Sequence, residues 1–156
     1  MAQSSPIRES SAAVVVRPVT SGADRRRFIR FAHRLYADDP NYRAPVDMMV
    51  REQLSAKDNP CCEHGEAALF LALRGDRIVG RISAQVDRLH LERYEDGAGF
   101  FGFFEVEDDF EAAQALLHPA ADGCRAQGMT KMRGPFSLSI HEETGLLVEG
   151  LDTPNY

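Results

Sequence analysis

The chain has 156 residues, of which 44% are hydrophobic and 27% are charged, and its formal net charge is -6. This length and composition are typical of one globular domain with a real hydrophobic core. The acidic balance argues against a nucleic-acid partner, because phosphate backbones are bound chiefly through clustered Lys and Arg. No apolar run of about 18 residues is present to span a bilayer. We therefore expect a cytoplasmic protein with neither a nucleic-acid nor a membrane partner.

Two features of the sequence concern the termini and the thiols. Residues 1–12 are polar and rich in serine, and we expect them to form a disordered tail ahead of a single domain over residues 13–156. The three cysteines are odd in number and include the adjacent pair Cys61 and Cys62, so no disulfide framework is indicated.

The first predicted elements are a strand and two helices. Residues 14–19 are β-branched and carry Pro18, which favours an edge strand. Ser21 and Asp24 form a capping signal for a helix that ends before Asp38-Asp39-Pro40. Pro45 suits the first turn of a second helix, which ends before Asn59-Pro60. The first helix also carries a basic cluster that we interpret as its solvated face: Arg25, Arg26, Arg27, Arg30 and Arg34.

Three strands are predicted next. Residues 67–73 and 77–86 are apolar and are separated by Gly75-Asp76, which is the turn chemistry of an antiparallel hairpin. A polar stretch through Glu95-Asp96-Gly97 reads as a long connection. Residues 100–106 are rich in phenylalanine and are followed by acids, as expected for a buried strand that ends at a polar surface.

The last predicted elements are a helix and a fifth strand. Asp108 and Glu111 have the D-x-x-E spacing of a helix cap, and Pro119 predicts a kink or a break within the helix. Gly128 ends this helix, and residues 129–136 lead into the fifth strand. The fold class is therefore α/β, with a mixed, mainly antiparallel sheet flanked by helices. The helix is expected to bury Phe110, Ala113, Leu116, Leu117, Ala120, Ala121 and Cys124.

This order of elements resembles the N-terminal part of the GNAT superfamily of acyl-CoA N-acyltransferases. Several short motifs also resemble a bacterial GNAT-related family whose members are considerably longer. The resemblance implies an incomplete GNAT domain that lacks the usual C-terminal helix and two strands, and a homodimer could cover the exposed edge of the fifth strand. The motifs are Asp38-Asp39-Pro40-Asn41-Tyr42, Asn59-Pro60, Gly102-Phe103-Phe104-Glu105, Arg133-Gly134-Pro135 and Gly145-Leu146-Leu147.

The resemblance implies transfer of an acetyl or acyl group from acyl-CoA to a small-molecule amine. In GNAT enzymes the pantetheine arm enters between the fourth and fifth strands, and the pyrophosphate rests on the amides of the next helix. Glu105 would take the proton from the amine, with its pKa raised toward neutral by neighbouring phenylalanines. The residues that would bind acetyl-CoA are Glu105, Val106, Glu107, Asp108, Asp109 and Phe110.

The chain lacks the Q/R-x-x-G-x-G/A loop with which the superfamily binds pyrophosphate, and Asp108 and Asp109 bring negative charge to that position. This leaves open a second hypothesis, a non-catalytic GNAT-like remnant or binding module.

Two further motifs resemble parts of metal sites, but no metal site is expected. Residues 140–146 resemble the end of a Nudix box, the Mg²⁺-dependent diphosphate hydrolase motif, but Leu138 and Ser139 stand where that motif needs Arg and Glu. Cys61, Cys62 and His64 lack a fourth zinc ligand and the usual spacing.

Overall fold

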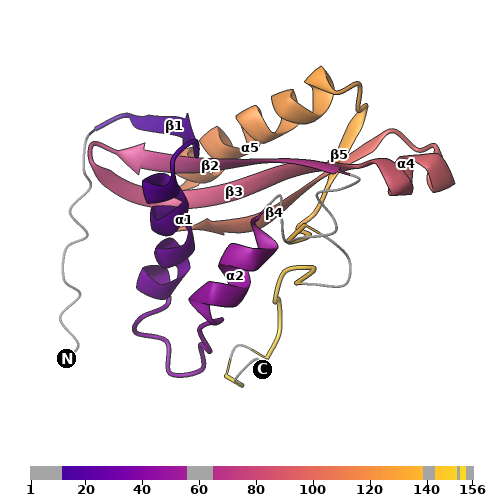
Figure 1. Ribbon diagram of the computed structural model, residues 1–156. Coiled ribbons are helices and arrows are strands. Elements are labelled where there is room, and N and C mark those ends of the chain that lie inside the picture. The colour runs from indigo at the N-terminus through magenta and orange to yellow at the C-terminus, as the bar shows by residue number, and fades with distance from the viewer. Residues whose placement is uncertain (1–11, 56–64, 139–142, 151, 154–156) are drawn as a thin grey trace.

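The computed structural model describes residues 12–55, 65–138, 143–150 and 152–153. Its described elements form one five-stranded sheet in the order β1-β2-β3-β4-β5, antiparallel except for the β4-β5 pair, with helices on both faces (Figure 1). The predicted α/β class is confirmed. The strands are β1 (Val14–Pro18), β2 (Gly65–Arg74), β3 (Arg77–Asp87), β4 (Ala98–Val106) and β5 (Lys131–Arg133), and the helices are α1 (Gly22–Leu35), α2 (Asp47–Gln53), α4 (Arg88–Tyr94) and α5 (Phe110–Ala126).

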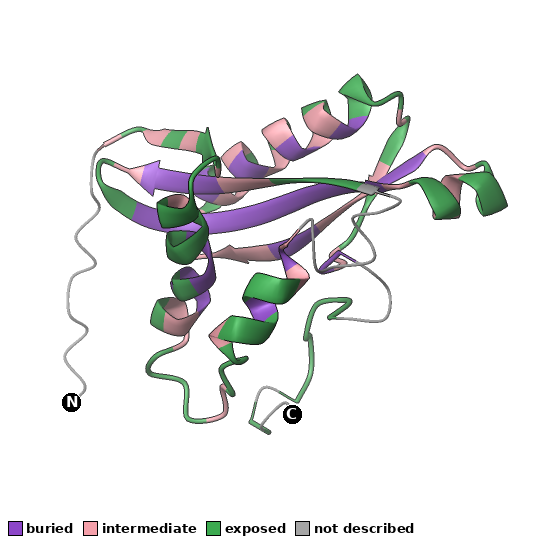
Figure 2. Cartoon of the chain, in the orientation of Figure 1, coloured by how far each residue is buried: buried purple, intermediate pink, exposed green. Residues whose placement is uncertain are grey.

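Two hydrophobic clusters hold the helices to opposite faces of the sheet. In the first cluster, Phe28 and Phe31 of α1 and Val50 of α2 pack with Leu71 of β2 and Phe103 of β4. The second cluster joins α5 to the other face, and its fully buried members include Leu116 and Ile82. Strand β3 lies between the two layers and is buried along almost its whole length (Figure 2).

The predicted hairpin and the first helix are confirmed. Strands β2 and β3 pair antiparallel around the turn, with a register shift between Ala72 and Leu73, and Gly75 adopts a φ of 60° that glycine accepts without strain. Helix α1 begins after Ser21, whose side-chain oxygen accepts a hydrogen bond from the amide of Asp24 at 3.0 Å. Local turn and cap chemistry was sufficient to place both elements.

Helix α4 was not predicted, because residues 88–94 were interpreted as part of a connection. It starts where the side chain of Asp87 accepts hydrogen bonds from the amides of Leu89 and His90. None of its residues is buried. A helix without an apolar stripe has no periodic signal, so only the cap could have revealed it.

Two expectations about α5 were wrong, and of the kink or break expected at Pro119 the break is absent. The N-cap is Asp109 rather than Asp108, because Asp109 is the aspartate whose side chain accepts from the amide of Ala112. The helix runs through Pro119 without a break, since Leu116, Ala120 and Cys124 pack on the sheet on both sides of it. The buried residues of α5 are Ala112, Leu116, Ala120 and Cys124, whereas Phe110 is 82% exposed and the other expected members, Ala113, Leu117 and Ala121, are half-buried.

Strand β5 is shorter than predicted and pairs with β4 through only three residues of each strand. The ladder ends before Pro135, which has no N–H to donate. The chain then passes directly over β4: an added Cβ on Gly102 would lie 1.8 Å from the carbonyl oxygen of Phe136. An isolated β-bridge joins Phe136 to Thr144, so the chain around Thr144 lies against the segment that follows β5.

Among the described residues, no helix is long and apolar enough to cross a membrane.

Candidate functional site

The second half of β4 has a strand neighbour on one side only, within the described residues. The parallel pairing to β5 stops at Phe100, whereas the pairing to β3 continues to Val106. Between these positions the ladder shifts register opposite Arg81 and Ser83, and Phe103 adopts a φ of 44°. The backbone of residues 104–106, which we call the β4 edge, therefore has no strand partner on the β5 side in the described part of the chain.

Glu105 lies on this edge and forms an ion pair with the buried guanidinium of Arg81. Arg81 is 5% exposed, and its Nη1 also donates to the carbonyl oxygen of Phe28 at 2.8 Å. The guanidinium carbon lies 4.9 Å from the ring centre of Phe28 and 5.3 Å from that of Phe103. The phenylalanines thus surround an ion pair, whereas the sequence interpretation had them surround an isolated carboxyl group.

Two tyrosines from the α1-α2 connection stack near the same carboxylate. The rings of Tyr36 and Tyr42 are 4.8 Å apart. Burial, with a further contribution from the charge of Glu105, raises the pKa of Tyr36 to about 12, and the same two causes raise the pKa of Tyr42. Both hydroxyls therefore keep their protons at neutral pH and can donate hydrogen bonds.

Strand β3 supplies a buried polar row that sequence reasoning missed, because residues 77–86 were interpreted as uniformly apolar. Ser83 donates to Gln85 at 2.9 Å, and Gln85 donates to the carbonyl oxygen of Phe136 at 2.6 Å. With Arg81, these residues repeat at every second position of a strand that is otherwise apolar. That alternation is the signal that could have found them.

The N-terminus of α5 is occupied by its own side chains. Both carboxylate oxygens of Asp109 accept from Arg74 of β2, at 2.6 and 3.0 Å, and one also accepts from the amide of Ala112 at 3.0 Å. Arg74 also contacts Glu111 at 2.6 Å. The guanidinium of Arg74 lowers the pKa of Asp109, so this carboxylate is charged at neutral pH.

This arrangement does not fit a pyrophosphate on the first turn of α5. The donor amide that an anion would use already serves Asp109, and two carboxylates lie beside it. Glu107, just before the helix, is likewise paired, with Arg77 at 2.6 Å and with Arg34 at 3.5 Å. The arginines that balance these acids were not identified from the sequence, since they lie far away in the chain.

The six predicted site residues divide into two groups in space. Glu105 contacts Arg81, which packs against Phe28 of α1, whereas Asp109 contacts Arg74 at the start of α5. Phe110, the first residue of α5, is exposed. Among the residues that the structure describes, no group of three or more His, Cys, Asp or Glu could hold a metal ion. Cys61, Cys62, His64 and residues 139–142 lie outside the described residues.

This architecture defines the class of fold. A crystal structure of an aminoglycoside acetyltransferase from an uncultured soil metagenomic sample superimposes with a TM-score of 0.54, covering 77% of this chain and 75% of that one at 16% identity. The resemblance to GNAT acetyltransferases is thus confirmed at the level of the fold.

Two curated relatives are more similar in sequence, and no protein-family model matches the chain. A bacterial ceramide synthase from Caulobacter vibrioides is 46% identical over 150 residues, and Protein YghO from Escherichia coli is 44% identical over 140 residues. These alignments cover 96% and 90% of this chain but only 39% and 36% of the relatives. The chain therefore spans little more than a third of the length of either protein.

Proposed function

We propose that this chain takes part in N-acyl transfer, moving an acyl group from acyl-CoA to an amine at the β4 edge. The observation that carries the proposal is the cluster of Glu105, Arg81, Tyr36 and Tyr42 beside that edge, on an acetyltransferase fold. A carboxylate and neutral hydroxyl donors are the groups that such a transfer needs, one to accept a proton and the others to hold oxygen or nitrogen atoms in place.

The acceptor we propose is a long-chain amino alcohol. The support comes from the 46% identity to a bacterial ceramide synthase, because a ceramide is an amide of a fatty acid with such an amine. A long acyl chain on the donor follows from the same comparison.

In the proposed reaction, the amine nitrogen forms a bond to the thioester carbonyl carbon and the carbon–sulfur bond breaks, so that CoA leaves as a thiolate and takes up a proton from the solvent. The proton lost by nitrogen goes to Glu105, which the ion pair with Arg81 holds in one orientation. The hydroxyls of Tyr36 and Tyr42 donate hydrogen bonds to the substrates. The unpaired backbone of the β4 edge offers N–H and C=O groups to an amide-containing arm of the donor. No role is assigned to the first turn of α5, because the amide of Ala112 donates to Asp109 and the carboxylates of Asp109 and Glu111 lie there.

The test is to incubate the chain with a long-chain acyl-CoA and a long-chain amino alcohol and to measure the amide product by mass spectrometry. We expect amide formation that falls at least about a hundredfold in Glu105→Gln, the loss expected for a missing proton acceptor. Glu66→Gln is the matched control, because Glu66 pairs with Arg88 on the exposed surface. Either no product from folded protein or equal rates in the two variants would contradict the proposal.

A second candidate is the non-catalytic binding module, and one observation favours it. The Asp109–Arg74 contact fills the position at which the superfamily binds pyrophosphate. This candidate predicts that the folded chain does not bind acyl-CoA at all.

A further inference from the structure

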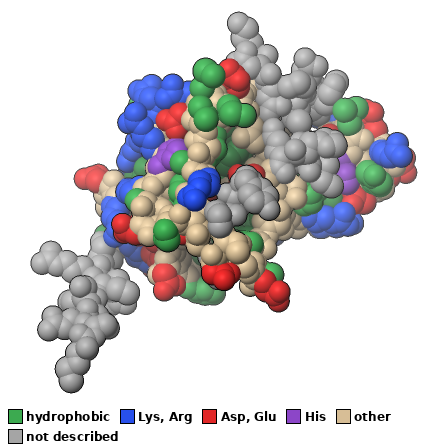
Figure 3. Space-filling model, turned by 90° about the horizontal axis from the view of Figure 1, so that it is seen from below, with side chains coloured by type: hydrophobic (Ala, Val, Ile, Leu, Met, Phe, Trp, Pro, Cys, Tyr) green, Lys and Arg blue, Asp and Glu red, His purple; other side chains and the backbone are tan. Residues whose placement is uncertain are grey.

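The surface formed by α1 and α2 carries an excess of positive charge in an acidic chain. The two helices hold six arginines and three acids, although the net charge of the whole chain is -6. We call this surface the α1-α2 face. In Figure 3, Lys and Arg side chains gather at the upper left, with hydrophobic side chains beside them. The arginines are Arg25, Arg26, Arg27, Arg30, Arg34 and Arg51.

Half of these arginines have no acidic partner among the residues that the structure describes. Arg27 pairs with Asp24, Arg34 with Glu107, and Arg51 lies 3.9 Å from Asp47. Within the ranges that the structure covers, no carboxylate is close enough to form an ion pair with the exposed guanidinium groups of Arg25, Arg26 or Arg30. Their charge is therefore available to an external anion.

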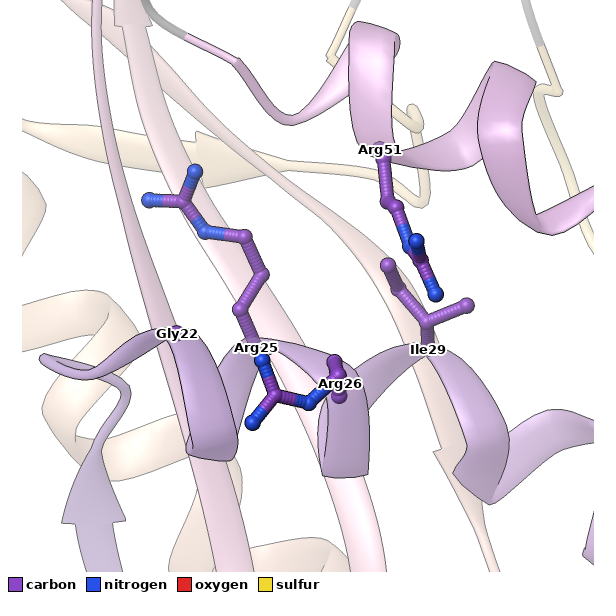
Figure 4. A pocket seen from close by; sticks show the side chains of 5 residues that line it. All are labelled: Gly22, Arg25, Arg26, Ile29 and Arg51. Atoms are coloured by element: carbon purple, nitrogen blue, oxygen red, sulfur yellow. The ribbon is translucent and has the colours of Figure 1, made fainter.

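A shallow hollow of about 150 Å³ joins the two helices within this face (Figure 4). It is lined by Gly22, Arg25, Arg26 and Ile29 of α1 and by Arg51 of α2. Ile29 is 3% exposed, whereas the three arginines are all exposed. A single small ion bound here would contact only arginines that are also hydrated. A surface that carries several phosphate groups could instead contact all of these arginines at the same time.

Apolar side chains are exposed beside these charges. Val46, Met48 and Met49, at the start of α2, are 58%, 62% and 62% exposed. Arginines next to flexible apolar side chains are typical of surfaces that lie on a membrane. If this surface bound the phosphate backbone of a nucleic acid, the exposed methionines would find no apolar groups to contact.

We propose that the α1-α2 face docks on the surface of an anionic phospholipid bilayer. Arg25, Arg26 and Arg30 contact headgroup phosphates, while Met48 and Met49 reach into the boundary with the acyl chains. This proposal does not depend on the acyl-transfer proposal, since it concerns another surface. It departs from the expectation of no membrane partner, which considered only segments that span a bilayer.

The test is cosedimentation with vesicles of one part phosphatidylglycerol to two parts phosphatidylcholine, compared with pure phosphatidylcholine vesicles. We expect the chain to bind only the anionic vesicles. The triple variant Arg25→Gln/Arg26→Gln/Arg30→Gln is expected to bind about a hundredfold more weakly, at about fivefold for each arginine. The variant Met48→Ser/Met49→Ser is expected to bind several-fold more weakly.

The matched control is Arg88→Gln/Arg93→Gln/Arg125→Gln, which removes the same charge from α4 and α5 and is expected to bind like the unaltered chain. Circular dichroism checks that all variants are folded. Four results would overturn the proposal: no binding to anionic vesicles, equal loss in the two triple variants, binding to mixed-sequence RNA as tight as to vesicles, or release by inorganic phosphate but not by chloride at equal ionic strength.

Discussion

Arg81 places a positive charge almost entirely inside the protein, where its partners are Glu105 and the carbonyl oxygen of Phe28. Removing one partner of a buried ion pair leaves the other charge without compensation, which typically costs 3 to 5 kcal/mol. We therefore expect Arg81→Met to lower the free energy of unfolding by about 3 kcal/mol, measured by urea denaturation.

The double variant Arg81→Met/Glu105→Gln is the control for this prediction. Because it removes both charges, it should be more stable than Arg81→Met. A double variant as unstable as the sum of the two single variants would show that the two side chains do not interact.

The ionisation of Tyr36 and Tyr42 makes the stability of the protein depend on pH in the alkaline range. Burial and the charge of Glu105 raise the pKa of Tyr36 from 10.0 to about 12. The folded state therefore holds the phenolic proton more tightly than the unfolded state does, so the contribution of Tyr36 to stability is constant below pH 10 and falls as pH rises from 10 toward about 12.

A spectrophotometric titration of the phenolate groups checks this expectation. Tyr36→Phe should remove the ionisation whose midpoint lies at about 12. Titration of all tyrosines near pH 10 in the folded chain would contradict the described cluster.

At the scale of elements, the close passage of the chain over β4 requires glycine. A Cβ on Gly102 would overlap the backbone of Phe136, which cannot move aside as a side chain could. Gly102→Ala should lower the free energy of unfolding by at least about 2 kcal/mol.

Gly123 in α5 provides the matched control, because nothing lies within 4 Å of an added Cβ there. Gly123→Ala should stabilise the protein by about 0.5 to 1 kcal/mol, since alanine loses less backbone entropy than glycine in a helix. Equal effects of the two substitutions in thermal unfolding would mean that β4 and the segment after β5 do not pass as closely as described.

The elements that could be predicted from the sequence are those with local signals. Gly75-Asp76 marks the hairpin and Ser21 marks the start of α1, and both act within a few residues of the chain. The start of α5 could not be assigned in the same way, because Asp108 and Asp109 are both good caps. Asp109 is the one bound by Arg74, a residue 35 positions earlier in the chain.

In the candidate site, too, only the residue with a local sequence signal could be predicted. Glu105 was chosen from its position at the end of an aromatic strand, and its role as a proton acceptor stays a prediction. Its partner Arg81 and the tyrosines Tyr36 and Tyr42 come from other elements, so no local motif joins them. Long-range pairs of this kind follow from the packing of α1 on the sheet, which sequence periodicity does not specify.

At the scale of the whole molecule, the two proposals concern different surfaces. The proposed acyl-transfer site is the β4 edge, whereas the proposed membrane contact lies on the outer side of α1 and α2. The loop after α1 connects them, because it carries Tyr42 and leads into α2. A homodimer that covers the edge of β5 stays a prediction.

The most direct measurement for the central claim is a calorimetric titration of the chain with a long-chain acyl-CoA. Binding should weaken at least about tenfold in Phe110→Glu, which adds a negative charge at an exposed position four residues after Val106, the last residue of the β4 edge, and should be unchanged in Tyr94→Glu on α4. Absence of binding by the folded chain, or equal weakening in both variants, would contradict acyl transfer at this edge and leave the binding-module reading.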